Sequence, residues 1–180
     1  MFFSSNLRAY LKHGGVIAYP TESCFGLGCD PRNRRAVQKI LRLKQRPWYK
    51  GLIVVAANLG QVQRFIQPLD TVQKETLNRY WPGPFTFLLP RSTRASKCVT
   101  GRHKTLAVRV SAHPEVACMT RLLGPLISTS ANITGQKSLT RGADVRRIFG
   151  TAVRVLPGRV GRRKQPSVII DLQSGVKLRG

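Results

Sequence analysis

Hydroxyl groups and a glycine-rich turn come together in residues 20–28, which read Pro-Thr-Glu-Ser-Cys-Phe-Gly-Leu-Gly. Glycine lets a backbone approach a ligand closely, and a hydroxyl such as that of Ser23 binds a ligand without adding charge. This segment therefore predicts contact with a small polar ligand. A tight turn between a strand and a loop, with no ligand, accounts for the same residues.

Cations are concentrated in a second segment, residues 44–51, where Lys44, Arg46 and Lys50 follow the end of an expected helix. A helix C-terminus favours cations by about 0.3–1 kcal/mol each, which is one explanation of the cluster. The other explanation is a triphosphate clamp. In that case Arg46 acts as a bidentate fork and Lys44 as a point charge.

Short polar side chains form the third and fourth segments. Residues 128–132 read Ser-Thr-Ser-Ala-Asn, and residues 165–171 place Ser167 directly before an apolar strand. Such residues commonly make local turns with the backbone, and the basic run at 159–164 is typical of a solvated face. They can equally orient a small amino acid or a phosphate oxygen.

Several familiar catalytic patterns are absent. The sequence has no GxxxxGK[ST] phosphate loop, no complete dinucleotide fingerprint and no GxSxG elbow. Three histidines are scattered, and four cysteines show no CxxC spacing, which argues against a zinc site. With only seven acidic residues, a protein-held metal cage is disfavoured. Cations and neutral donors suit phosphoryl chemistry, in which positioning and charge neutralisation dominate.

Helical and strand-like segments alternate along the chain and predict a single α/β domain over residues 1–180. The helix from Asp70 is expected to turn Val72 and Leu77 inward, and the helix from Pro114 to turn Leu122 inward. Helices are expected at residues 5–13, 33–44, 70–80, 114–123 and 143–149, and strands at 16–19, 52–57, 85–89, 106–110, 126–128, 153–156, 168–172 and 176–178.

The charge of the chain is its most unusual bulk property. Thirty-one Lys and Arg residues face seven Asp and Glu residues, giving a formal net charge of +24. Such an excess predicts a polyanionic partner, nucleic acid ahead of a membrane surface. No apolar stretch approaches about 20 residues, and no secretory signal is recognised, so a cytoplasmic protein with reduced thiols is expected.

The ordered segments together resemble the YrdC/TsaC family of threonylcarbamoyl-AMP synthases. The resemblance rests on PTESCFGLG at 20–28, KQRP at 44–47 with the strand at 52–54, WPGPFT at 81–86, AVRVSAHP at 107–114, STSANITG at 128–135 and PSVIID at 166–171. It covers about residues 5–179 and matches the short, single-domain bacterial form.

This resemblance implies a twisted, mixed and parallel sheet flanked by helices, with the active site on a concave basic face. It also implies that bicarbonate or CO2 first carbamoylates threonine. The carbamate oxygen then attacks the α-phosphorus of ATP, pyrophosphate leaves, and Mg²⁺ arrives with the ATP. The implied partners are tRNA or double-stranded RNA and the transferase complex that moves the threonylcarbamoyl group to tRNA, with no membrane.

The family motifs also imply site residues. Lys44 and Arg46 are the implied catalytic pair, and Ser23, Arg109, Ser130 and Ser167 are the implied threonine ligands. The implied ATP ligands are Arg46, Lys50, Thr105, Asn132, Thr140 and Arg179. Longer relatives carry a threonine-binding histidine where this chain has Val55, so the threonine pocket must be completed differently. Cys24 is interpreted as a packing residue.

A second function of a different class also fits the composition. A non-catalytic binding protein for double-stranded RNA or tRNA, or a ribosome-assembly factor on the same fold, would use the basic segments at 32–50, 91–104 and 141–164 for backbone contact. The uncharged set Ser23, Ser130, Asn132 and Ser167 discriminates between the two, because a threonine pocket needs these residues and a phosphate binder does not.

Overall fold

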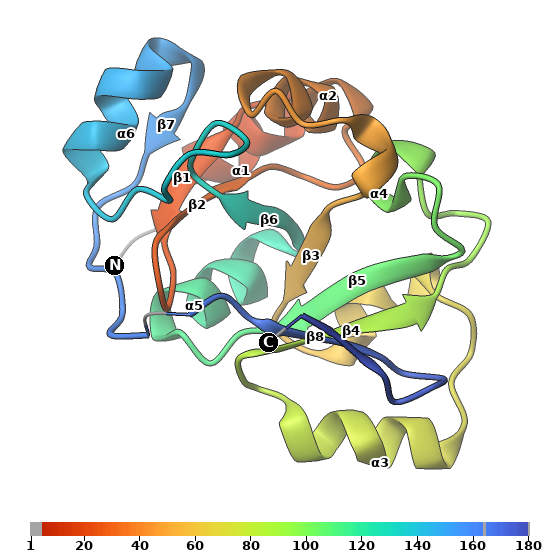
Figure 1. Cartoon of the computed structure of the whole chain (residues 1–180). Helices are drawn as coiled ribbons and strands as arrows, with labels where there is room; N and C mark the ends of the chain where they lie inside the picture. Colours follow the sequence, from red (N-terminus) through yellow and green to blue (C-terminus); the bar gives the residue numbers. More distant parts are fainter. Residues whose placement is uncertain (1–4, 164, 180) are drawn as a thin grey trace.

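A computed structural model describes residues 5–163 and 165–179 as helices packed around one sheet (Figure 1). The strands are β1 (Ile17–Pro20), β2 (Phe25–Gly28), β3 (Ile53–Ala56), β4 (Phe85–Pro90), β5 (Thr105–Val110), β6 (Leu126–Ser130), β7 (Arg154–Val155), β8 (Val168–Asp171) and β9 (Lys177–Arg179). Over the described residues they form a nine-stranded sheet in the order β7-β1-β2-β6-β3-β5-β4-β8-β9.

The sheet is mixed, as expected. The pairs β1–β7, β3–β5 and β4–β8 are parallel, and the other neighbours are antiparallel. One strand was missed, because residues 25–28 form the buried strand β2 and are not part of a turn. Its two glycines hide the apolar alternation that would reveal a strand. β2 pairs with both β1 and β6 and so brings the first polar segment beside the third.

The helices are α1 (Ser5–Lys12), α2 (Arg34–Leu43), α3 (Thr71–Tyr80), α4 (Lys97–Thr100), α5 (Pro114–Leu123) and α6 (Gly142–Phe149), with 3₁₀ turns η1 (Trp48–Lys50), η2 (Leu59–Phe65) and η3 (Gly150–Ala152). Five of the six α-helices among the described residues begin within about one residue of the predicted position, whereas α4 and the 3₁₀ turns were not predicted. The Asn33 side chain caps α2 by accepting a hydrogen bond from the Ala36 amide at 3.1 Å. Asp70 and Gln73 form a reciprocal capping box at the start of α3.

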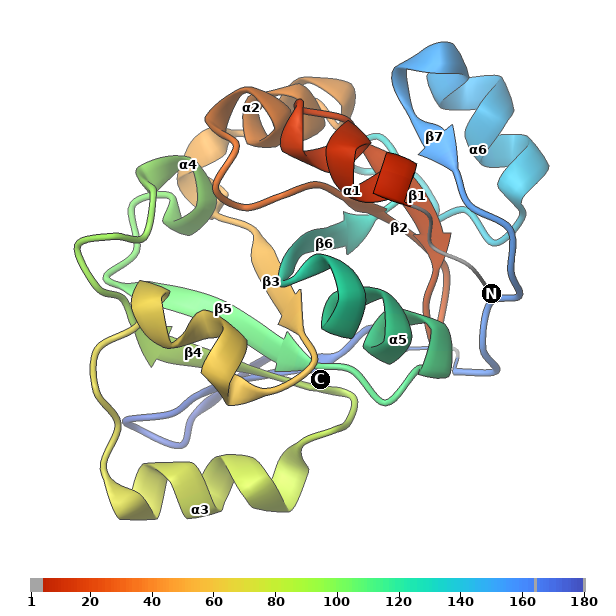
Figure 2. The ribbon, with the colours of Figure 1, turned by 180° about the vertical axis from the view of Figure 1, so that it is seen from behind.

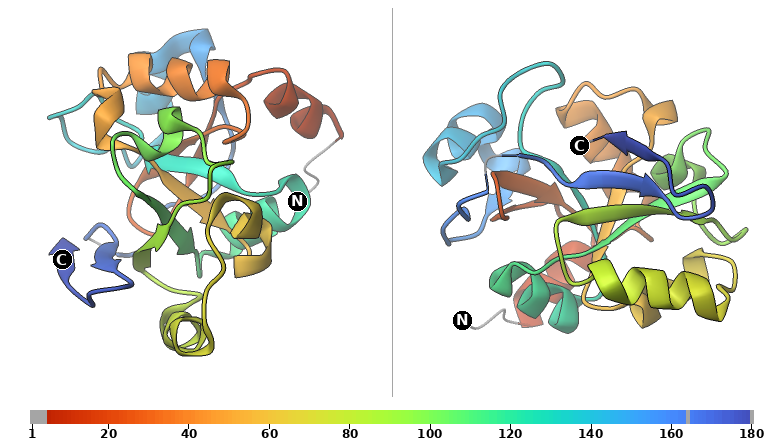
Figure 3. Two further views of the ribbon diagram at one scale, coloured as in Figure 1. Left: turned by 90° about the vertical axis from the view of Figure 1, so that its right-hand side faces the viewer. Right: turned by 60° about the horizontal axis from the view of Figure 1, so that its bottom comes forward.

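Two expected core residues lie outside the core. Val72 is 71% exposed on α3, and Leu122 is 48% exposed on α5. α3 packs at the edge of the molecule beyond β4 (Figure 3), so it presents only a narrow stripe, centred on Leu77, to the interior. Val72 lies five residues before Leu77, about 140° away around a helix, so the two cannot share one narrow buried face, and the prediction for Val72 was wrong.

The two faces of the sheet have different roles, because side chains alternate along a strand. Leu106 and Val108 of β5 and Val54 of β3 enter the main core with the apolar face of α2. Ile17, Tyr19 and Val55 point the other way and pack against α1 and α5, which lie together in Figure 2. Beyond this second cluster the same face is hollow, and a cavity occupies it. No helix among the described residues is long and apolar enough to cross a bilayer.

Candidate active site

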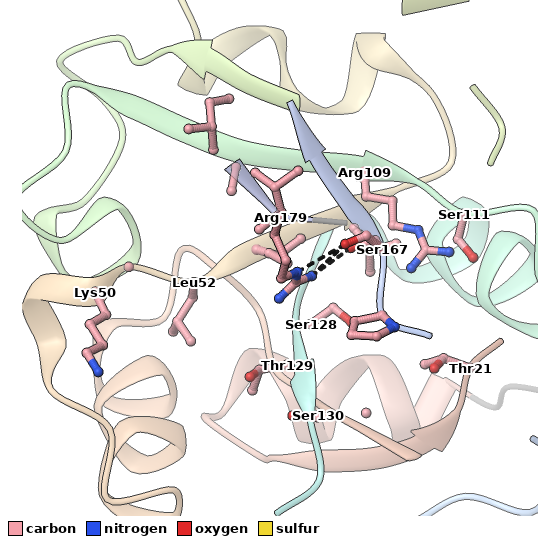
Figure 4. A pocket seen from close by; sticks show the side chains of 18 of the residues that line it. Thr21, Lys50, Leu52, Arg109, Ser111, Ser128, Thr129, Ser130, Ser167 and Arg179 are labelled. Atoms are coloured by element: carbon pink, nitrogen blue, oxygen red, sulfur yellow. Dashed lines mark hydrogen bonds between the residues drawn. The ribbon is translucent and has the colours of Figure 1, made fainter. Parts of the chain in front are cut away.

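A cavity of about 380 Å³ opens on the sheet between the β1–β2 turn, β3, β5, β6 and the β8–β9 hairpin (Figure 4). This volume lies in the range typical of small-molecule sites, about 300–1,000 Å³. The sequence-predicted residues that line it are Ser23, Arg46, Lys50, Thr105, Arg109, Ser130, Ser167 and Arg179. All four polar segments therefore meet at one cavity, although they are far apart in the sequence.

Strand alternation aims Arg109 into the cavity. Thr105, Ala107 and Arg109 line it, whereas the intervening Leu106 and Val108 are in the core. Arg109 Nε donates a hydrogen bond to the Gly83 carbonyl at 3.0 Å, which fixes the guanidinium. Burial lowers the pKa of Arg109 below the ordinary arginine value, and the Glu22 carboxylate opposes that shift.

Glu22 is the acidic neighbour of this arginine. Its Oε1 lies 2.6 Å from Arg109 Nη2 and accepts a hydrogen bond of 2.6 Å from the Ser111 hydroxyl. The side chains of Arg109 and Glu22 are 15% and 18% exposed, so the pair is largely shielded from water. The cavity thus contains a nearly buried, mutually neutralised pair beside Ser111.

The remaining charged residues make the rest of the cavity positive. Arg46 is half-buried, and its Nε and Nη2 donate to the Gly51 carbonyl at 3.1 and 2.9 Å. Lys50 is exposed and lies at the opposite end of the cavity from Ser111 and Thr21 (Figure 4). Arg46 and Arg179 line the same cavity, and burial, followed by repulsion from Arg46, lowers the pKa of Arg179. Neighbouring like charges that face a cavity favour a polyanion such as a triphosphate.

Arg179 is anchored to Ser167, so β9 and β8 contribute to the site together. Arg179 Nη2 donates to the Ser167 carbonyl at 2.8 Å and to its hydroxyl at 3.1 Å (Figure 4). The Ser167 hydroxyl also lies 2.9 Å from the Thr86 hydroxyl. Every side chain in this set is therefore held in place by another polar group.

Lys44 does not line the cavity. Its side chain is buried, with the whole residue 3% exposed, and its ammonium donates to the Ser130 carbonyl, to the Asn132 carbonyl at 2.8 Å and to Asn132 Oδ1 at 3.2 Å. Burial lowers the pKa of Lys44 to about 8, with repulsion from Arg46 as the second cause and Cys24 opposing it. Lys44 thus lies behind the cavity wall and supports the loop that carries Ser130.

Asn132 and Thr140 also lie outside the cavity lining. The amide of Asn132 is fully engaged, because Oδ1 accepts from Ser130 Oγ at 2.6 Å and Nδ2 donates to the carbonyls of Ile133 and Gln136 at 2.9 and 2.6 Å. Thr140 is exposed. The SxN pair is therefore a hydrogen-bonded unit in which Ser130 faces the cavity and Asn132 supports it.

Sequence reasoning assigned no role to several residues of the cavity wall. They are Thr21, Glu22, Ser111, Ser128 and Thr129. Glu22 could have been identified from the sequence as a candidate site residue, because it is an acidic residue inside a hydroxyl-rich motif of a chain that has few acidic residues. Cys24 is half-buried at the cavity wall, with Ser23 Oγ 3.9 Å from its sulfur.

The arrangement can bind two chemically different groups side by side. One end offers unneutralised cations, and the other offers an arginine–glutamate pair with hydroxyls. Among the described residues, no group of three His, Cys, Asp or Glu side chains is placed to hold a metal ion.

Comparisons with known sequences identify related proteins. The profile of the Sua5/YciO/YrdC family, described as telomere recombination, matches residues 9–179. A threonylcarbamoyl-AMP synthase of Laribacter hongkongensis is 56% identical over 172 residues, 96% of this chain and 93% of that protein. The enzyme of the same name from Chromobacterium violaceum is 53% identical over 96% of this chain and 90% of its own length.

Solved structures have the same fold. The P. abyssi Sua5 structure complexed with L-threonine superimposes with a TM-score of 0.87 at 30% identity, covering 96% of this chain. This chain spans about half the length of that protein, 51%. E. coli YciO superimposes with a TM-score of 0.83 at 24% identity over 97% of this chain and 86% of its own, which supports the fold alone.

Proposed function

The chain belongs to the Sua5/YciO/YrdC family, and we propose that the cavity beside Arg46 and Arg109 is where it makes threonylcarbamoyl-AMP. The activity itself follows from the relatives. Threonylcarbamoyl-AMP synthases about half identical to this chain match it over nearly their full length, so this protein is an enzyme of that kind. Its substrates are threonine, bicarbonate or CO2, and ATP.

One observation supports placing the reaction in this cavity: a positively charged surface and a hydroxyl-rich surface meet there. Arg46, Lys50 and Arg179 offer positive charge for the triphosphate, and Thr105 lines the same cavity. Ser23, Arg109, Ser130 and Ser167 offer hydroxyls and a guanidinium to threonine. A carboxylate matches an arginine fork, and phosphoryl transfer needs charge neutralisation more than covalent chemistry.

The cavity residues contribute to the reaction chiefly by positioning the substrates. Threonine is carbamoylated with loss of water from bicarbonate, and a carbamate oxygen then attacks the α-phosphorus as pyrophosphate leaves. Arg46 and Arg179 counter the negative charge that collects on the phosphates during this displacement. Lys44 and Asn132 contribute by holding Ser130. Magnesium enters as part of the ATP complex and supplies further charge neutralisation.

The experiment that tests this proposal is a pyrophosphate-release assay with the purified chain, threonine, bicarbonate, ATP and Mg²⁺. We expect release that depends on threonine, with threonylcarbamoyl-AMP identified by mass spectrometry. Arg46→Ala should lower kcat/KM about 10²–10³-fold, the typical effect of removing one donor to a developing charge. Arg42→Ala, an exposed arginine of α2 outside the cavity, is the matched control.

Pyrophosphate release that does not depend on threonine would contradict the proposed function. Equal effects of Arg46→Ala and Arg42→Ala would contradict the assignment of the reaction to this cavity. A pure RNA-binding module, the second candidate, is disfavoured because the hydroxyls of Ser23, Ser130 and Ser167 converge on one cavity of small-molecule size.

We also propose two macromolecular partners, an RNA and the transferase complex. Exposed arginines on and near α6, including Arg141, Arg146, Arg147 and Arg154, suit contact with the phosphates of tRNA or double-stranded RNA. Because the product is consumed in tRNA modification, we propose a cytoplasmic reaction and delivery to the threonylcarbamoyl transferase complex. Co-purification of tRNA at low salt and its release at high salt would support the RNA contact.

A further inference from the structure

Glu22 is the only carboxylate among the described residues that line the cavity. The other ionisable groups of the lining include Arg46, Lys50, Arg109 and Arg179. A carboxylate is a poor choice for a site devoted to anions, because it weakens their binding. At the Glu22 end of the cavity, Arg109 already pairs with one oxygen of this carboxylate, and a positive group in the ligand would match the other.

The charges at this end match an amino-acid backbone. Standard bond lengths place the ammonium nitrogen of an α-amino acid about 2.5 Å from its carboxylate carbon. Glu22 Oε1 and Arg109 Nη2 are in contact at 2.6 Å, so a negative group and a positive group also lie side by side at this end of the cavity. A zwitterion laid against this pair sets its carboxylate on the guanidinium and its ammonium on the carboxylate.

Both members of the pair retain free hydrogen-bonding capacity. In the part of the chain that the structure describes, the hydrogen bond from Ser111 ends on Oε1 of Glu22, and no hydrogen bond reaches Oε2. Arg109 Nη2 touches Oε1, but its N–H groups do not point at that oxygen, and this buried nitrogen has no hydrogen-bond acceptor there. An unmade buried hydrogen bond is costly, so the pair favours a ligand that completes it.

We infer that Glu22 binds the ammonium group of the amino-acid substrate while Arg109 binds its carboxylate. Ser111 and Arg109 hold Oε1, and Oε2 faces the ammonium. The inference rests on the proposed function, since it specifies how the threonine end of that cavity recognises its ligand.

The Glu22–Arg109 pair also influences where the carbamate group lies in the cavity. Threonine ammonium and bicarbonate yield the carbamate, water and one proton, so the nitrogen substituent changes from positive to negative. Glu22 attracts the ammonium and repels the carbamate, whereas Arg46 and Arg179 attract the carbamate. The charge change therefore shifts the new group from Glu22 toward the cations, where the phosphates bind.

Calorimetry with two ligands tests the inference. Threonine and 3-hydroxybutyrate share the carboxylate and the hydroxyl, but 3-hydroxybutyrate lacks the amine. The wild-type chain should bind threonine about 10- to 100-fold more tightly, the range expected for one hydrogen bond to a charged group. Glu22→Gln keeps the shape of the side chain but removes its charge, and it should reduce that ratio to within about threefold.

The controls separate ammonium recognition from structural support. Glu75→Gln, an exposed acid of α3, should leave the ratio unchanged, and Glu22→Asp should retain preference for threonine. If Glu22→Gln weakens both ligands equally, Glu22 only positions Arg109 and the inference is overturned. Wild-type protein that binds both ligands equally overturns it even if the variant does not fold. Wild-type protein that binds no threonine overturns the proposed function as well.

Discussion

Replacing Lys44 with methionine should destabilise the protein, and the loss should grow as the pH rises. The ammonium of Lys44 makes three hydrogen bonds that join the end of α2 to the Ser130–Asn132 loop. The loop is also tied to the Lys44 carbonyl through the Thr134 amide at 2.9 Å and hydroxyl at 2.8 Å. Methionine keeps the length of the side chain but leaves three oxygen atoms without this donor.

The magnitude follows from two opposing contributions. Hydrogen bonds from a charged group contribute about 1.5–3 kcal/mol each. Burial lowers the pKa of Lys44 from 10.5 to about 8, which costs about 3 kcal/mol at neutral pH. The hydrogen bonds exceed this cost, so we expect Lys44→Met to reduce the free energy of unfolding by about 2–5 kcal/mol at pH 7.

The pH dependence has a definite sign. Below pH 8 both the folded and the unfolded chain hold the Lys44 proton, so this residue gives no slope. Between about pH 8 and 10.5 the unfolded chain binds the proton more tightly, and the free energy of unfolding rises with pH. Wild-type protein should therefore gain about 2 kcal/mol over Lys44→Met between pH 7 and 9.5.

Urea unfolding of both proteins at pH 7 and 9.5 measures this difference. Tyr19 and Cys29, whose pKa values are raised by burial, titrate in both proteins and cancel in the comparison. Lys74→Met, on an exposed position of α3, controls for loss of one charge. If the difference in free energy of unfolding between wild type and Lys44→Met is the same at both pH values within about 0.5 kcal/mol, the pKa of Lys44 is not lowered. A gap near zero at both pH values would refute the supporting role.

Three further substitutions have separate expected outcomes. Cys24→Ser should keep kcat within about threefold, because no nucleophile is needed at that wall; a loss beyond about 100-fold in pyrophosphate release would contradict this. Gly51→Ala should lower the free energy of unfolding by more than about 1 kcal/mol in urea melts, since Gly51 has φ +62° and a Cβ there would lie 2.9 Å from the Thr100 carbonyl; an unchanged midpoint would exclude the strain. Ser167→Ala should raise the KM for threonine more than the KM for ATP, and the reverse order in steady-state kinetics would assign the hydroxyl of Ser167 to Arg179 alone.

Most of the secondary structure could be predicted, because local signals and tertiary structure agree. Asn33 and Asp70 cap helices as their sequence positions indicate. β5 shows a strict alternation, and Leu106 and Arg109 fall on opposite faces as the strand period requires. β2 was missed because a Gly-Leu-Gly strand has little pattern of its own and is specified by its neighbours β1 and β6.

The candidate site was predicted as a set of segments but not as a set of contacts. Ser23, Arg46 and Arg109 come together at the cavity from three different elements, because Ser23 follows β1, Arg46 follows α2 and Arg109 lies on β5. Lys44 and Arg46 belong to one motif, yet Arg46 lines the cavity and Lys44 is buried in the protein interior. Which of two nearby cations faces a ligand depends on the chain direction after the helix ends. That direction is set by tertiary packing.

The scarcity of acidic residues has a practical consequence at the bench. Among the described residues only three ion pairs form, two of them on the surface, in a chain of net charge +24. Mobile ions screen such self-repulsion over about 10 Å at 0.1 M, and the same ions compete for any bound polyanion. Concentrated salt should thus strip contaminating nucleic acid from a preparation and strengthen the fold in one step, whereas dilute buffer works against both.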